Sequence, residues 1–320
     1  MLEGLERMPE YQFNKSANVS FQEERILTQR LNKYENEAIR KGELLQQAEI
    51  SSETYEELLN IYEGHEEWVK QRLSLDIFSR MTPLFNNIHF YSPEKWEEIR
   101  KENNKPVGWM GGHEFPGNTI RFVNSGKQAE MVSAFNHELT HSGSHKTVHA
   151  VRDTENPEQL PDMDKYPRYG FANTRNGAFS AFNEAVTEMI NLEMLYDYKI
   201  KNPGKKYLNN IEPCYQTNII VFDAILEEAA KKLKQDKKFI LDKVYLSYYD
   251  GNIKRLDFLE KAFGEGTLKK IANLRDDLPR SEELEGLVTD LLSDGKDVIE
   301  KLSEFKKSGN SSLPDEAGSE

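Results

Sequence analysis

Four of the chain's seven histidines lie at four-residue intervals in the segment AFNHELTHSGSHKTVHA, namely His137, His141, His145 and His149. In an α-helix, residues four apart are separated by about 40° around the axis and about 6 Å along it. His137 and His141 can therefore bind one ion together, whereas His145 would lie about 12 Å from His137. Gly143 predicts that the helix ends soon after His141, so His145 is an alternative ligand only if the chain turns back. The spacing predicts a helix with an ion-binding face.

The same segment carries an apolar seam on another face of the helix. The seam lies within an arc of about 100° and consists of Met131, Val132, Phe135 and Leu139. Glu138 follows His137 directly and points beside the ion, as a general base for a metal-bound water does. Ser125 and Gln128 have the spacing of a capping box, which predicts a helix start near Gly126. The alternative interpretation is a solvent-exposed pair of histidines that binds no metal.

A catalytic zinc needs one more protein ligand than two histidines supply. The segment GAFSAFNEAVTEMINLEM, in a helix predicted from about Ala178 to Lys201, offers Glu184 and Glu188, which lie four residues apart. Its core stripe consists of Phe179, Phe182, Val186, Met189, Ile190 and Met194. Apolar residues on several sides of the carboxylates predict burial, and a cation would offset the cost of burying them. The alternative is a solvated helix surface.

HELTH followed by NEAVTE resembles the gluzincin class of zinc metallopeptidases, which carry HExxH on one helix and NExx(S/T)(D/E) on the next. The residues that match this pattern are His137, His141 and Glu184 as zinc ligands, Glu138 as the base, Glu188 as the carboxylate that orients a ligand histidine, and Asn183 as a buried supporting residue. The resemblance also implies that GNTIRFVNSG is the edge strand along which a peptide lies antiparallel. His141 and Glu184 are 43 residues apart, which is longer than in thermolysin, and the irregular 146–176 segment supplies the extra length.

The implied activity is hydrolysis of peptide bonds by a zinc-activated water, with one Zn²⁺ as the cofactor, Glu138 as general base and a peptide or protein as substrate. Gluzincins stabilise the oxyanion with a Tyr or His. Tyr215 is the predicted donor, because it follows the glutamate helix and precedes an apolar one, and Tyr166 and Tyr169 are alternatives. We interpret His145 and His149 as surface or cleft-wall residues.

Two further interpretations use the same residues. HELTHSGSH with the later EAVTE also resembles the metallopeptidase-like domain of antirestriction and phage polyvalent proteins, although the glycine lies one position early. Alternatively, the chain is a non-catalytic helical scaffold that zinc staples together. Structural zinc sites usually have four protein ligands, often cysteines, and need no general base.

The net charge of −13 argues against nucleic acid or an anionic membrane as the main partner, because both require a basic face. Cys214 is the single cysteine, which excludes an internal disulfide framework. The N-terminal residues do not have the pattern of a signal peptide, and no apolar run is long enough to span a membrane. These features predict a cytoplasmic protein.

Patterning predicts three segments: an N-terminal helical hairpin over 1–82, a zincin-like metallopeptidase domain over 83–305, and a disordered tail over 306–320. The hairpin consists of two charged helices, the second capped by Ser52. The catalytic domain has an upper part to about residue 143 and a helical lower part, with helices near 213–235, 237–249, 254–274 and 282–305.

Two strands, IHFY and NTIRFV, and a helix that begins at SPEKWEEIR complete the upper part. We therefore expect an α+β fold that is predominantly α-helical. Its zincin-like catalytic domain would contain a small mixed sheet, preceded by the N-terminal hairpin and followed by a helical C-terminal subdomain.

Overall fold

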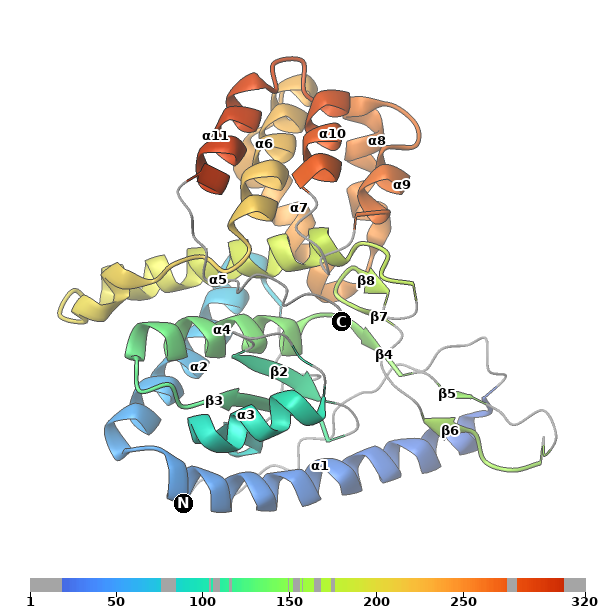
Figure 1. Ribbon diagram of the computed structural model, residues 1–320. Coiled ribbons are helices and arrows are strands. Elements are labelled where there is room, and N and C mark those ends of the chain that lie inside the picture. Colours follow the sequence, from blue (N-terminus) through green and yellow to red (C-terminus); the bar gives the residue numbers. More distant parts are fainter. Residues whose placement is uncertain are drawn as a thin grey trace, which may run out of the picture.

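The computed structural model describes residues 19–75, 85–103, 105, 110–114, 117–148, 150–151, 156, 158–163, 168–173, 176–274 and 281–307. The described part is mostly helical, with a small mixed sheet (Figure 1). This confirms the predicted α+β class with a helical majority. The N-terminal residues 1–18 and most of the predicted disordered tail lie outside the described residues, although Lys306 and Lys307 end the last helix.

The sheet has the strand order β1 (Ile88–Tyr91), β3 (Thr119–Val123), β2 (Gly111–Glu114), with β1 and β3 parallel and β2 antiparallel to β3. The predicted strands IHFY and NTIRFV are thus present. However, β3 is the central strand, so its assignment as the edge strand was wrong. The strand beside it at the edge is β2, with the sequence GGHE. Its two glycines provide no apolar alternation, and its pairing with β3 determines its conformation.

The two faces of the sheet bury different side chains. Ile88, Phe90, Ile120 and Phe122 belong to the main core, which also contains Phe135. Tyr91 and Val123 point to the other face and pack with α3 (Pro93–Glu102). As predicted, α3 begins after Ser92, whose Oγ accepts a hydrogen bond from the backbone N–H of Lys95. The sheet is thus held between α3 and the histidine helix.

The histidine helix is α4 (Gln128–Gly143), and it ends at the predicted glycine. Its predicted capping box is wrong: Lys127 is the N-cap residue and no side chain caps the helix. Gly126 has φ 72°, which turns the chain one residue before the cap. Ser125 therefore accepts a hydrogen bond from Lys127 N–H at 3.3 Å instead of capping α4.

The glutamate helix is α5 (Ser180–Lys201), and it starts and ends close to the predicted positions. Contacts between α4 and α5 pair early residues of one helix with late residues of the other, so the two run antiparallel side by side (Figure 1). The apolar seams of both helices are buried, except that Phe179 is only partly buried. Both predicted stripes thus face the core.

The N-terminal helices are α1 (Phe21–Glu49) and α2 (Ser52–Leu73). The N-cap of α2 is Ser51, one residue before the predicted Ser52. α1 packs on β1 and on the short helix η2 (Phe85–Asn87), and it lies along the base of the molecule in Figure 1. α2 packs instead on α4, α5 and α7 (Lys237–Asp250). The two helices thus contact different parts of the chain.

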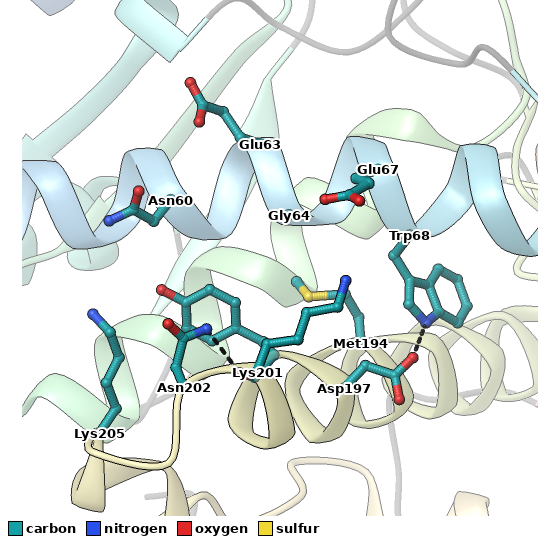
Figure 2. A pocket seen from close by; sticks show the side chains of 11 residues that line it. Asn60, Glu63, Gly64, Glu67, Trp68, Met194, Asp197, Lys201, Asn202 and Lys205 are labelled. Carbon is teal, nitrogen blue, oxygen red and sulfur yellow. Dashed lines mark hydrogen bonds between the residues drawn. The ribbon is translucent and has the colours of Figure 1, made fainter.

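Where α2 and the C-terminal half of α5 meet, they border a groove of about 310 Å³. In Figure 2, Trp68 of α2 reaches across, and its Nε1–H donates to Asp197 of α5 at 3.0 Å. A Cβ at Gly64 would lie 3.6 Å from Tyr198 Cδ2, which is an ordinary van der Waals contact, so the two helices would also accommodate an alanine here. The same buried cluster that contains residues of α2 extends to the C-terminal helices. α2 is therefore part of the central core.

The C-terminal helices gather on the side of α5 away from the sheet (Figure 1). They comprise α6 (Gln216–Leu233), α7, α8 (Asp257–Phe263), α9 (Thr267–Ala272), α10 (Ser281–Leu291) and α11 (Lys296–Lys307), with the short helix η4 (Ile253–Leu256). The short helix η3 (Lys206–Asn210) contacts α4 instead. The predicted continuous helices over 254–274 and 282–305 were wrong. Gly264 and Gly266, with φ 100° and 90°, interrupt the first, and a turn before α11 interrupts the second.

The segment between α4 and α5 forms short strand pairs in its described parts. They are β4 (Lys146–Thr147), β7 (Arg168–Tyr169) and β8 (Ala172–Asn173) in one sheet, and β5 (Ala150–Val151) and β6 (Asp162–Met163) in another. None of the described helices combines the length and apolar character needed to cross a membrane.

Candidate metal centre

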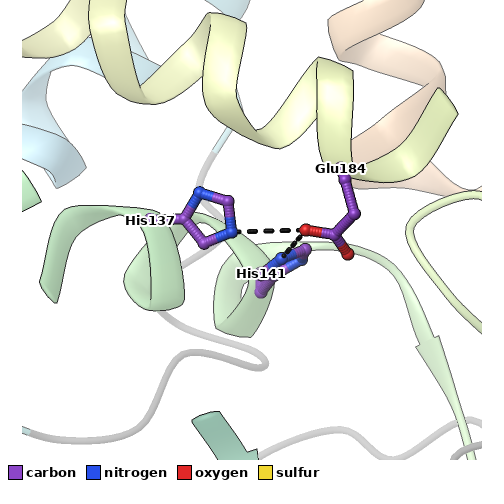
Figure 3. A group of neighbouring side chains, drawn as sticks. All are labelled: His137, His141 and Glu184. Atoms are coloured by element: carbon purple, nitrogen blue, oxygen red, sulfur yellow. Dashed lines mark hydrogen bonds and ion pairs between the residues drawn. The ribbon is translucent and has the colours of Figure 1, made fainter. Parts of the chain in front are cut away.

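His137, His141 and Glu184 converge at the centre of the molecule, between α4 and α5 (Figure 3). Nε2 of His137 lies 3.3 Å from Glu184 Oε2, and Nε2 of His141 lies 3.1 Å from the same oxygen. Each of the three residues is only 5–6% exposed. The convergence predicted from the two helical spacings is therefore present, and the alternative of solvent-exposed side chains is excluded.

The other ring nitrogen of each histidine, Nδ1, also has hydrogen-bonding partners. Nδ1 of His137 lies 2.6 Å from Glu188 Oε2, and a carboxylate oxygen can only accept, so Nδ1 carries the proton. Nδ1 of His141 lies 3.3 Å from each of two hydroxyls, those of Thr187 and Tyr248. Nε2 of both rings thus faces the same oxygen of Glu184.

Three electron-pair donors facing one another repel unless a proton or a cation lies between them. Tetrahedral zinc with bonds of about 2.0–2.1 Å to nitrogen and oxygen separates neighbouring ligand atoms by about 3.4 Å. The separations of 3.1 and 3.3 Å in this group are close to that value. The donor set of two imidazoles and one carboxylate thus fits a metal ion of this size.

The pKa values of the group reflect the same electrostatics. Burial lowers the pKa of His137, but its hydrogen bonds to the carboxylates of Glu184 and Glu188 outweigh this effect and raise the pKa well above its usual value. Burial raises the pKa of Glu184, but the charges of His141 and His137 outweigh it, and the pKa is lowered. The carboxylate is therefore ionised, and a positive charge beside it is strongly favoured.

Glu188 and Asn183, on either side of Glu184 in the helix, support the group from behind. Besides His137, Glu188 accepts hydrogen bonds from the backbone N–H of Cys214 and from Asn191 Nδ2, at 3.1 and 3.2 Å. Asn183 is fully buried, and its Oδ1 accepts from the backbone N–H of Phe171 at 2.8 Å. Asn183 thereby holds the segment before α5 against the helix.

Two residues that sequence reasoning did not select hold His141. Thr187 Oγ1 donates to the backbone carbonyl of Asn183 and lies 2.7 Å from the Tyr248 hydroxyl. Thr187 is part of the NEAVTE motif, so the motif itself contained a signal for it. Tyr248 lies in α7, 107 residues after His141, and no local pattern indicates it.

Glu138 lies beside the ligand pair, partly buried, and faces the edge strand. A Cβ at Gly111 of β2 would lie 3.0 Å from Glu138 Cγ, so the missing side chain of this glycine leaves room for the glutamate. Burial raises the pKa of Glu138, while the charges of His141 and His137 lower it less. A raised carboxyl pKa makes the carboxylate a better proton acceptor.

Tyr215 is the N-cap residue of α6, and its ring stacks on that of His137 with centroids 5.6 Å apart and an angle of 19° between the planes. The structure thus brings this predicted residue to the centre. Tyr166 lies outside the described residues, and so does the side chain of Tyr169.

His145 is not part of the metal group. It is 9% exposed, so of its two predicted positions, the surface or the cleft wall, the surface is excluded. The backbone N–H of His145 donates to the carbonyl of Tyr248, and its ring lies against Gly251, whose φ of 74° and lack of Cβ allow this approach. The turn after Gly143 therefore carries His145 to α7, away from the ligands. His149 lies outside the described residues.

A second buried polar cluster lies between the end of α4 and the edge strand, and sequence reasoning missed it. His113 Nε2 of β2 lies 2.8 Å from Asn118 Oδ1 and 3.4 Å from Lys146 Nζ. Asn118 in turn donates to Glu35 of α1 at 3.0 Å. Lys146 donates to the carbonyl of Ser142, and burial lowers the pKa of this lysine to about 7. The cluster joins α1, β2 and the end of α4.

Comparisons of this chain with protein-family models, with curated proteins and with solved structures found no match.

Proposed function

We propose that the chain is a zinc-dependent metallopeptidase with a zincin-like fold. The observation that carries the proposal is the convergence of His137, His141 and Glu184 on one point, with Glu138 beside them on the ligand helix. Two residues one helical turn apart and a carboxylate from the next helix are the ligand set of a catalytic zinc with an open position. The substrate is a peptide or protein, and the predicted location is the cytoplasm.

In this proposal His137, His141 and Glu184 hold the zinc, which supplies Lewis acidity toward the scissile carbonyl and lowers the pKa of water. Glu138 accepts the proton of the attacking water and delivers it to the leaving nitrogen. Glu188 keeps the proton of His137 on Nδ1, and the hydroxyls of Thr187 and Tyr248 hold the Nδ1 edge of the His141 ring.

The edge strand β2 is the proposed site of peptide binding. It pairs with β3 on one side only within the described sheet, and it lies next to Glu138. An extended peptide would add to the sheet through main-chain hydrogen bonds. Tyr215 is the proposed oxyanion donor, since it lies against a ligand histidine at the start of α6.

The stapled-scaffold alternative is less well supported. A structural zinc site is usually closed by four protein ligands, whereas the group found among the described residues has three. Glu138 would also have no function in such a site. Nucleic-acid binding at physiological salt would favour the alternative that resembles antirestriction and phage polyvalent proteins, but the net charge of −13 gives no support for such binding.

Glu138→Gln tests the proposal, with Glu130→Gln as the control because Glu130 is on the same helix and forms an exposed ion pair with Lys127. Purified protein is assayed on casein and on a peptide library, and its zinc content is measured by elemental analysis. We expect a chelator to abolish cleavage by the wild type. We also expect Glu138→Gln to retain zinc but lose about 10²–10⁴-fold in rate. Full activity of Glu138→Gln, or a wild-type protein that binds no zinc, would contradict the proposal.

A further inference from the structure

A line of buried polar side chains runs from the metal centre to α2. Glu188 Oε2 accepts from Asn191 Nδ2 at 3.2 Å, and Asn191 Oδ1 accepts from Asn136 Nδ2 at 2.7 Å. Asn136 Oδ1 then lies 2.8 Å from Nδ1 of His65, which is 71 residues earlier in the chain. The line therefore joins α2 to α5 through Asn136, the residue immediately before the first histidine of the HELTH motif.

The direction of these hydrogen bonds is determined by their two ends. The carboxylate of Glu188 can only accept, so Asn191 must turn its amide nitrogen toward it. Asn191 then presents its oxygen to Asn136, and Asn136 presents its own oxygen to His65. The ring of His65 must therefore donate from Nδ1. If either amide were reversed, two acceptor oxygens would face each other.

Burial makes each of these hydrogen bonds hard to replace. Glu188, Asn191, Asn136 and His65 are all 0% exposed, so bulk water does not reach their polar atoms. A buried donor or acceptor left without its partner is destabilising. Because each side chain in the line orients the next, the loss of one hydrogen bond also weakens the hydrogen bond that follows it. His65 is the last donor of the line, and it comes from a helix that supplies no metal ligand.

One further contact and the burial of the ring keep His65 in the state that donates from Nδ1. Nε2 lies 3.4 Å from the hydroxyl of Tyr249, which can donate to it. Burial lowers the pKa of His65 to about 4, so the ring is neutral near pH 7 and carries a single proton. With Nε2 accepting from Tyr249, that proton resides on Nδ1, facing Asn136.

We propose that His65 of α2 is a positioning residue of the metal centre: its Nδ1–H orients Asn136 and Asn191, and these hold the Glu188 carboxylate on Nδ1 of His137. The consequence at the centre is that Nε2 of His137 keeps its lone pair toward the metal. The inference rests on the proposed metal centre, but it concerns zinc affinity rather than peptide cleavage. A hydrogen-bond partner of a ligand histidine typically changes metal affinity by about 10- to 100-fold.

The test measures zinc affinity by competition with a chromophoric chelator. We expect His65→Leu, which removes the donor, to weaken zinc binding by about 10-fold, the lower end of that range, because His65 acts on His137 through intervening side chains. His65→Asn puts an amide N–H close to the place of Nδ1–H and should stay within about threefold of the wild type. Ile61→Ala is the control, because Ile61 is 0% exposed on the same helix and belongs to the apolar core. It should lower the melting temperature while leaving the zinc affinity unchanged.

A double-mutant cycle distinguishes an effect transmitted along this line of side chains from general destabilisation of the protein. In an Asn191→Leu background the line is already interrupted, so His65→Leu should cause no further loss of zinc affinity. Long-range ¹H–¹⁵N spectra of the zinc-loaded protein should show the His137 proton on Nδ1 in the wild type and in His65→Asn.

The inference is overturned if His65→Leu binds zinc like the wild type, or if His65→Leu, His65→Asn and Ile61→Ala all weaken binding equally. A wild-type protein that binds no zinc would overturn the proposed metal centre and this inference with it. Zinc binding by the wild type and by His65→Leu with equal affinity would overturn this inference alone.

Discussion

The inner face of α5 shows how neighbouring residues of one helix perform different tasks. Glu184 faces the two imidazoles, Glu188 accepts the proton of one of them, and Thr187 contacts the other. Asn183 accepts a hydrogen bond from the backbone N–H of Phe171, and Asn191 accepts one from the side chain of Asn136. All five are buried, and each has a hydrogen-bond partner, as buried polar groups usually do, although Nδ2 of Asn183 has none among the described residues. A buried polar stripe with four-residue steps is thus the local signal of this site.

His65 makes the stability of the metal-free protein depend on pH. Its pKa is about 6.5 when unfolded and about 4 when folded, because burial disfavours its charged form. Between these values the unfolded state binds a proton that the folded state does not, so the free energy of unfolding falls as the pH is lowered from 6.5 to 4. We expect His65→Asn to lose less stability than the wild type over this window, by on the order of 3 kcal/mol. Urea unfolding at each pH gives the free energy of unfolding of both proteins. The same dependence of this free energy on pH in the two proteins would contradict the prediction.

At the scale of elements, the position of Glu138 depends on how closely α4 approaches β2. Gly111 is opposite Phe122 in the sheet register, so its Cα faces the helix side of the sheet. A Cβ at this position would lie 3.0 Å from Glu138 Cγ and 3.2 Å from Phe122 Cβ. The glycine therefore permits the contact between the edge strand and the ligand helix.

Gly111→Ala should consequently displace Glu138 without removing a ligand. We expect kcat to fall by about 10-fold, because small misplacements of a reacting group are costly in rate, while zinc content stays the same. Gly204→Ala is the matched control, since a Cβ there would meet nothing within 4 Å. Peptide-cleavage kinetics with zinc analysis measure both variants. An unchanged kcat for Gly111→Ala would indicate that the strand is free to move away.

In the whole molecule, both N-terminal helices are connected to the ligand helix through buried polar groups. α2 reaches it through His65 and Asn136, and α1 reaches its end through Glu35, Asn118 and the cluster around Lys146. The side chains of Leu58, Ile61 and Val69 add α2 to the main core. The helices α1 and α2 thus contribute to the structure around the metal group.

A bound metal should therefore stabilise the whole fold. Binding to the folded state at a free zinc concentration about 100-fold above Kd adds about 2.7 kcal/mol to the free energy of unfolding. We expect a chelator to lower the melting temperature of the zinc-loaded wild type and to leave that of His141→Ala unchanged. Differential scanning calorimetry measures both proteins. An equal effect of the chelator on the two would show that the ion acts elsewhere.

Local spacing was sufficient to predict the ligand pair, the opposed glutamates, the apolar seams and most helices near the site. These features follow from the period of the helix, which places residues four apart on one face whatever the chain does elsewhere. The predicted capping box and the unbroken helix over 254–274 were wrong, because glycines with positive φ turn the backbone at those places, and a turn before α11 interrupts the predicted helix over 282–305. Such turns depend on the surrounding packing.

Tertiary packing alone brought the remaining parts together. Tyr248 meets His141 across 107 residues and His65 meets Asn136 across 71, and β2 forms a strand because β3 pairs with it. A periodic pattern reports that a face is buried, but it does not identify the side chain that it will meet. That choice depends on the register of helices distant in the chain, and the register is set by packing of the whole core.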